Sequence, residues 1–125
     1  MTYKLTTHPK PTFLHAVVTG RNTKENVEKY LEEVLRECLT QAFSKVLIEE
    51  RLEGPRLRIM DVFVLASEGS YMAQGKLKAV AYVDVNAEGN LMKFAGDVAN
   101  NRGLNVGIFQ NVIEAENWLL GQGEA

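Results

Sequence analysis

The sequence lacks the features that mark a secreted, disulfide-bonded or membrane-spanning protein. It has one cysteine, Cys38, so no disulfide can form within the chain. No apolar run approaches the roughly 18 residues of a membrane-spanning helix. Residues 1–10 are polar and hold no signal-peptide core. We therefore expect a cytoplasmic protein without a membrane span, in which Cys38 is a small buried apolar residue rather than a reactive thiol.

An excess of charge of one sign is also missing. The 14 Lys and Arg residues nearly balance the 16 Asp and Glu residues, which leaves a formal charge of -2. Nucleic-acid-binding proteins usually carry a basic stripe, and because the sequence has none we expect no binding to DNA or RNA. The length of 125 residues and the hydrophobic share of 46% are typical of one globular domain. We expect that domain to span residues 1–125, with a frayed tail at 121–125.

Motifs for catalysis and for metal binding are absent from the sequence. Gly103 and Gly107 precede and occupy an expected strand, whereas a phosphate-binding loop would place its glycines at the start of a helix. His8, His15 and Cys38 have no metal-ligand spacing. No Gly-x-Ser-x-Gly sequence is present. We therefore expect a protein that is not an enzyme and that has no metal or cofactor.

The hydrophobic pattern indicates strands that alternate with helices. Strands are expected where apolar residues alternate or form short runs, at residues 3–7, 12–19, 46–48, 76–85 and 104–109. Helices are expected where apolar residues recur every three or four positions, up to Ala42 for the first, then at 57–66 and 88–101, and up to Leu120 for the last.

Capping signals predict where these helices begin. Asn22, with Glu25 three residues later, predicts the start of the first helix, and Asn111 predicts the start of the last in the same way. Pro55 suits the first position of the second helix, because its missing N–H has no partner inside a helix there. Residues 69–70 are expected to close that region.

This order of elements predicts an α/β fold. A β-β-α-β-α-β-α-β-α chain needs crossover connections, so its sheet should be mixed and mostly parallel, with helices packed against it. Ligands of such sheets favour the crevice beyond the carboxyl ends of the strands. Glu50 follows the third strand and Asp84 lies at the end of the fourth, so both should lie at that edge.

The loop after the third strand is the strongest candidate site. A helix that starts at Pro55 would direct free N–H groups towards the loop, and Arg51 and Arg56 would add donors for a phosphate or a carboxylate. The alternative is that the neighbouring glutamates pair with these arginines and only hold the loop in shape. Glu49 and Glu50 should leave the strand on opposite faces, so we do not expect them to share a proton.

Four stretches resemble the SpoIIAA-like group of STAS domains, mostly uncharacterised bacterial proteins related to anti-sigma-factor antagonists. They are residues 47–57 (LIEERLEGPRL), 81–84 (AYVD), and 101–103 with 115–119 (NRG and AENWL). The resemblance covers essentially the whole chain and implies the same fold. In the antagonists a serine at the start of the second helix is phosphorylated. Residues 53–58 hold no serine or threonine, so we expect no switch of that kind.

The leading hypothesis is a non-enzymatic regulatory or protein-interaction module. An apolar second helix should leave Ile59, Val62 or Phe63 exposed for a homodimer or a protein partner, or else bury all three in the core. The candidate partner or anion-binding surface consists of Glu50, Arg51, Glu53, Gly54, Pro55, Arg56, Arg58, Ile59, Val62 and Phe63.

Two other functions stay open. A carrier or sensor of a small anionic or lipid-like ligand needs a dry cavity between helices and sheet, or an anion site at Pro55. The resemblance of the SpoIIAA-like group to CRAL-TRIO lipid carriers keeps this function in view. An enzyme would have to use Glu50, Asp84 and Arg102 together.

Overall fold

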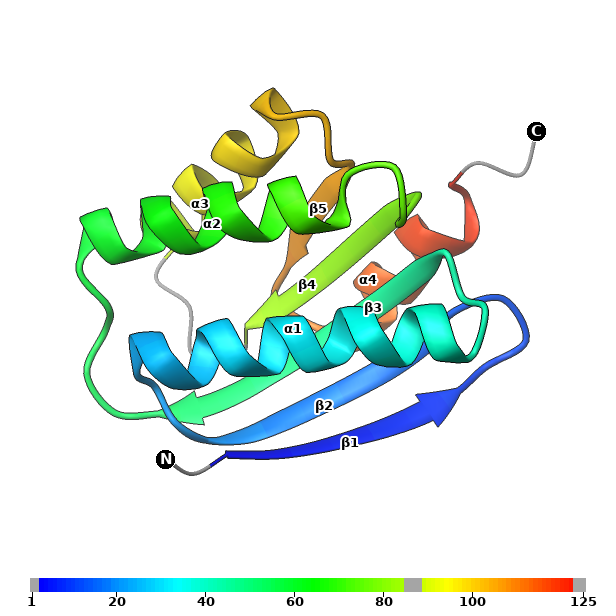
Figure 1. Cartoon of the computed structure of the whole chain (residues 1–125), viewed down its shortest axis with the longest axis horizontal. Coiled ribbons are helices and arrows are strands. Elements are labelled where there is room, and N and C mark those ends of the chain that lie inside the picture. The colour runs from blue at the N-terminus through cyan, green and yellow to red at the C-terminus, as the bar shows by residue number, and fades with distance from the viewer. Residues whose placement is uncertain (1–2, 85–88, 123–125) are drawn as a thin grey trace.

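The computed structural model describes residues 3–84 and 89–122. Its five strands form one mixed sheet in the order β1-β2-β3-β4-β5, in which β1 is antiparallel to β2 and the other neighbours are parallel (Figure 1). The strands are β1 (Tyr3–Pro9), β2 (Leu14–Arg21), β3 (Lys45–Glu53), β4 (Ala79–Asp84) and β5 (Val106–Phe109). The helices are α1 (Lys24–Thr40), α2 (Ile59–Ala73), α3 (Gly89–Asn101) and α4 (Val112–Leu120).

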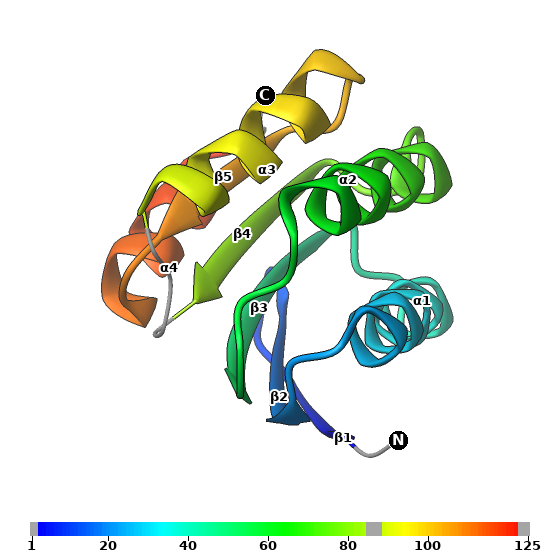
Figure 2. The same cartoon turned by 90° about the vertical axis from the view of Figure 1, so that its left-hand side faces the viewer.

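Helices cover both faces of the sheet. Helices α1, α2 and α3 lie on one face and α4 lies on the other, as Figure 2 shows. Alternation along the strands divides the core accordingly. Val46 and Ile48 of β3 pack with the α1 side, while Leu47 between them packs with Ala115 and Leu119 of α4. Cys38 is fully buried in the α1 layer, and burial raises the pKa of its thiol to about 12, so it is an unreactive apolar residue.

The predicted order of elements and the α/β class are confirmed, but the predicted cap of α1 is wrong. The Thr23 hydroxyl, not the Asn22 side chain, accepts the hydrogen bond from the backbone N–H of Asn26, at 3.1 Å. Asn22 lies before the helix because its backbone N–H donates to the Glu53 carbonyl and its side chain donates to the Pro55 carbonyl. The predicted cap at Asn111 is confirmed, since its side chain accepts from the N–H of Glu114.

The bounds predicted for β3 and α2 are also wrong. Pairing with β2 continues as far as Arg21 opposite Glu53, so β3 is longer than 46–48 and takes in part of the expected loop. Pro55 lies outside the helix, and α2 begins at Ile59 instead. The helix continues through Gly69 and Ser70 to Ala73, and the Ser70 hydroxyl donates to the Ala66 carbonyl within it.

Smaller differences concern the remaining ends. β4 begins at Ala79 and β5 at Val106, each later than predicted. The expected strand end at 85 and helix start at 88 lie outside the described residues. Gln122, expected in a frayed tail, donates through its backbone N–H to the Leu119 carbonyl, and residues 123–125 lie outside the description. Among the described residues, no helix combines the length and the apolar character needed to cross a membrane.

Candidate ligand-binding site

An apolar cavity of about 170 Å³ lies between the inner face of the sheet and helices α1, α2 and α3. All three helices and the sheet contribute residues to its walls. These residues include Val27, Leu31 and Val34 of α1, Val62, Leu65 and Ala66 of α2, Ala95 and Gly96 of α3, and Val46, Ile48 and Val80 of the sheet. Because protein interiors are normally filled to crystal density, a space of this size is a specific feature of the fold.

Small side chains on α2 and α3 leave this space open. Ala66, Gly69 and Ala73 of α2 line the cavity, as do Gly96 and Ala99 of α3. An engineered apolar cavity of about 150 Å³ in another protein binds benzene, so the space here suits a group about as large as one aromatic ring. The sequence contains these small residues, but nothing in their spacing shows that they face one shared space.

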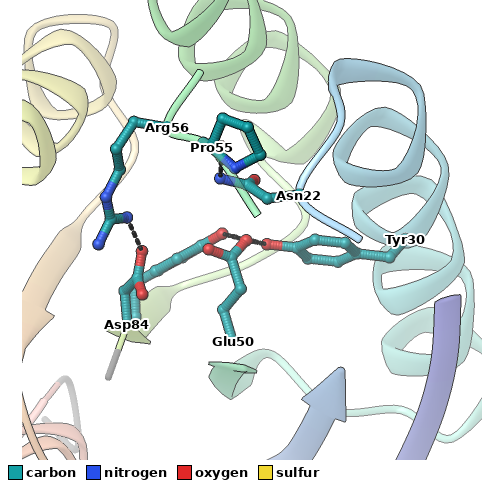
Figure 3. A network of polar contacts seen from close by, with 7 residues as sticks. Asn22, Tyr30, Glu50, Pro55, Arg56 and Asp84 are labelled. Carbon is teal, nitrogen blue, oxygen red and sulfur yellow. Dashed lines mark hydrogen bonds and ion pairs between the residues drawn. The ribbon is translucent and has the colours of Figure 1, made fainter. Parts of the chain in front are cut away.

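One end of the cavity is polar and lies at the carboxyl ends of β3 and β4. Glu50 of β3 stands opposite Asp84 of β4 in the register of the sheet. The hydroxyls of Tyr30 and Tyr82 both donate to Oε2 of Glu50, Tyr82 at 2.7 Å, and the two hydroxyls also contact each other. Arg56 Nη1 lies 3.7 Å from Oδ2 of Asp84 (Figure 3). We call Tyr30, Glu50, Arg56, Tyr82 and Asp84 the polar cluster.

The two carboxyl groups of the polar cluster are almost fully buried. Glu50 is 7% exposed and Asp84 is 5% exposed. Burial raises the pKa of Glu50 to about 7; hydrogen bonds from the two tyrosines oppose this rise, and the neighbouring Asp84 adds to it. Burial also raises the pKa of Tyr30 and of Tyr82 well above the ordinary range, so both stay neutral donors. Near neutral pH the Glu50 carboxyl therefore exists in both its protonated and its ionised form.

The neighbouring Glu49 belongs to a separate group on the opposite face of the sheet. Its carboxylate bonds Nε2 of His15 at 2.9 Å and Nε of Arg51 at 2.6 Å. These bonds lower the pKa of Glu49 even though its burial acts to raise it. The prediction that Glu49 and Glu50 leave the strand on opposite faces is confirmed, and Arg51 lies away from the cavity.

The residues of the predicted surface do not form one patch. Arg56 reaches the polar cluster and Val62 lines the cavity, whereas Ile59 is 56% exposed. Phe63 packs against the ring of Phe94. Arg58 is the N-cap residue of α2, Glu53 ends β3, and Gly54 with Pro55 forms the turn between them.

This geometry bears on two of the hypotheses drawn from the sequence, the anion site at Pro55 and the enzyme that uses Glu50, Asp84 and Arg102. The helix start at Pro55, on which the predicted anion site depended, is wrong, because α2 starts four residues later, at Ile59. The triad of the enzyme hypothesis is brought together only in part. Glu50 faces Asp84, but the Arg102 guanidinium lies over the Phe63 ring, 5.3 Å from its centre. Across residues 3–84 and 89–122, no cluster of three or more His, Cys, Asp or Glu side chains is arranged for a metal ion.

Sequence reasoning missed the two tyrosines of the polar cluster. Tyr30 falls in the apolar stripe of α1, and Tyr82 was indistinguishable from the other residues that alternate along β4. One signal was present, since Tyr82 and Asp84 are two residues apart and so share a face of the strand. Glu50 reaches the same face from the neighbouring strand.

Comparison with known proteins identifies the fold as SpoIIAA-like, in agreement with the sequence resemblance. A solved structure from Shewanella loihica PV-4, an uncharacterised protein of the DUF3478 family with a SpoIIAA-like fold, is similar to this chain. The TM-score is 0.56 at 22% sequence identity, and the match covers 94% of this chain and 93% of the other. No family model and no curated protein matches the sequence.

Proposed function

We propose that this protein is a non-enzymatic regulatory module that binds a small molecule, as a sensor or a carrier. The observation that carries the proposal is the apolar cavity of about 170 Å³ that ends at the polar cluster. Binding sites for small molecules are typically concave and apolar, with few polar groups that fix the orientation of the ligand. The polar end of the cavity also lies near the carboxyl ends of β3 and β4, the edge of a parallel sheet at which ligands usually bind.

The arrangement of the polar cluster suits binding of a ligand more than transfer of a proton to a substrate. Both tyrosine hydroxyls donate to Glu50, so they hold the carboxyl group in place. Arg56 forms an ion pair with Asp84. The Arg56 side chain is 34% exposed, so this end of the cavity reaches the surface. A ligand can therefore enter beside Arg56 and place its apolar part among the helices.

A protein-interaction module is the second candidate, and the outer face of α2 favours it. Met60 is 65% exposed and Tyr71 is 81% exposed, and they lie about three turns apart on the same side of the helix. Ile59 is also exposed, at the start of the same helix, and a protein partner or a second copy of the chain could cover these apolar side chains. Ligand binding in the cavity and partner binding on these side chains use different residues.

Native mass spectrometry of the protein, purified gently from the cells that make it, separates the two functions. The small-molecule proposal predicts extra mass of roughly a hundred to a few hundred daltons that is lost on denaturation. An Ala66→Leu variant, which fills the cavity, is the control and should carry no such mass. Extra mass equal to a second chain, with no small molecule in either variant, would favour the interaction module instead.

A further inference from the structure

We propose that the cavity binds an amphipathic cation, namely a protonated amine whose apolar part is about one aromatic ring in size and whose ammonium group bonds the carboxyls of Glu50 and Asp84. This inference rests on the proposed function and names its class of ligand. Its two components are the size of the apolar space and the charge at the polar end, and each is set by different residues.

The size of the cavity limits the apolar part of the ligand. About 170 Å³ is close to the roughly 150 Å³ that holds one benzene molecule. Val46, Ile48 and Val80 line the cavity on the sheet side, and Leu65 and Leu31 line it on the helix side. The space between the helices and the sheet therefore fits a compact ring or a short branched chain.

The charge at the polar end selects a cation. Two buried carboxyl groups stand side by side there, and the Arg56 guanidinium lies 3.7 Å from Asp84 and is partly solvated. A ligand anion would enter a low-dielectric space beside these carboxyls and would be repelled. An ammonium group would instead form charge-assisted hydrogen bonds with them.

Binding of a cation must be coupled to loss of a proton. The groups that face Glu50 are Tyr30 from α1, and Tyr82 and Asp84 from β4, with Arg56 acting through Asp84. Because the pKa of Glu50 is about 7, its carboxyl is mostly protonated near pH 6. An ammonium group favours the ionised form, so its affinity should rise about tenfold from about pH 6 to about pH 8 as the competing proton leaves.

Three probes that share one ring test this inference by isothermal titration calorimetry of the full chain. Benzylamine supplies the cation, benzyl alcohol a neutral head and benzoate an anion. We expect benzylamine to bind most tightly and to gain about tenfold in affinity over that pH interval. Near pH 6, titrations in two buffers of different ionisation enthalpy should show release of nearly one proton per benzylamine. Benzyl alcohol should bind with little pH dependence, and benzoate should bind least.

Two adjacent glutamates supply matched variants. Glu50→Gln should remove the proton release, because no ionisable carboxyl remains at that position, and should weaken the preference for benzylamine over benzyl alcohol to what Asp84 alone provides. Glu49→Gln removes the same charge on the opposite face of the sheet and should leave both unchanged. If Glu50→Gln does not fold, the proton count of the unmodified protein decides the question.

The outcomes separate this inference from the proposed function. Equal affinity for benzylamine and benzyl alcohol, or proton uptake on binding of benzylamine, would overturn the cation assignment and leave a small-molecule site in place. If none of the three ring compounds binds, the small-molecule function fails together with the inference drawn from it.

Discussion

Glu49 and Glu50 are adjacent in the sequence and have opposite electrostatic environments. Glu49 accepts hydrogen bonds from His15 and Arg51, which lower its pKa. Glu50 is buried at the end of the cavity beside Asp84, and its pKa is raised to about 7. The alternation of a strand is enough to separate two identical side chains into a structural ion pair and a candidate ligand-binding group.

These opposite shifts predict opposite effects of pH on stability. The raised pKa of Glu50 means that the folded state binds its proton more tightly than the unfolded state does. Stability is therefore lost as pH rises from about 4.5 to about 7, by about 3 kcal/mol for this group. Glu50→Gln should remove most of that loss, as urea unfolding at several pH values will measure.

Glu49→Gln is the control for that prediction. Because the pKa of Glu49 is lowered, its contribution to stability is lost as pH falls below the ordinary value of 4.5. The variant should therefore change the acid side of the stability profile, and it should not remove the loss of stability that Glu50 causes between about pH 4.5 and about pH 7. A profile that Glu50→Gln leaves unchanged between about pH 4.5 and about pH 7 would contradict the burial of a titrating carboxyl at that position.

At the residue scale, the local sequence pattern predicted which face of the sheet a side chain lies on, but not which residues it contacts. Strand alternation was enough to place Glu49 and Glu50 on opposite faces. The partners of Glu50 were out of reach of such reasoning, because Tyr30 lies 20 residues away and Tyr82 lies 32 residues away. An aromatic residue in an apolar stripe gives no indication of where its hydroxyl finds a partner.

At the element scale, the start of α1 depends on Thr23. Its hydroxyl accepts from the backbone N–H of Asn26, which would otherwise lack a partner in the first turn. Thr23→Ala should therefore cost about 1 kcal/mol in the free energy of unfolding, measured by chemical denaturation. Thr40→Ala, the same change at the exposed last residue of α1, should change it little. Equal effects of the two substitutions would argue against the cap.

Two glycines should respond in opposite directions to substitution by alanine. A Cβ at Gly69, inside α2, would lie 3.8 Å from Leu31 Cδ1, an ordinary contact, so Gly69→Ala should stabilise by up to about 1 kcal/mol. A Cβ at Gly107 in β5 would lie 2.8 Å from Phe109 Cε2, so Gly107→Ala should destabilise by about 1–3 kcal/mol. Thermal unfolding of both variants measures the signs, and a shared sign would contradict this packing.

Element types were predictable from the sequence because periodicity is local, whereas several bounds were not. β3 extends to Glu53 because β2 pairs with it as far as Arg21. Pro55 stays outside α2, and its carbonyl accepts a hydrogen bond from Asn22. Both effects join segments about thirty residues apart, so a capping rule applied to neighbouring residues misplaces the helix start.

At the scale of the whole molecule, the order of strands and helices predicted the mostly parallel sheet, and the solved SpoIIAA-like structure confirms the fold. The cavity was predicted only as a requirement of the carrier hypothesis. Its existence depends on how three helices pack over one face, and volume left between small side chains is not visible in a one-dimensional pattern.

Filling the cavity should leave the fold intact. Ala66→Leu adds side-chain volume inside the cavity. The free energy of unfolding should therefore stay the same or rise, by as much as about 2 kcal/mol. Ala115→Leu adds the same volume in the fully buried core under α4 and should destabilise by about 1–3 kcal/mol. A comparable loss of stability in Ala66→Leu would show that the space is not open in solution.

The most direct test of the central claim is a methyl NMR titration of the protein and of its Ala66→Leu variant with benzyl alcohol. A small-molecule site predicts shifts concentrated at Val46, Ile48 and Leu65, which line the cavity, and their loss in the variant. Shifts confined to exposed Met60 and Ile113, or the same shifts in both proteins, would contradict a binding site between the helices and the sheet.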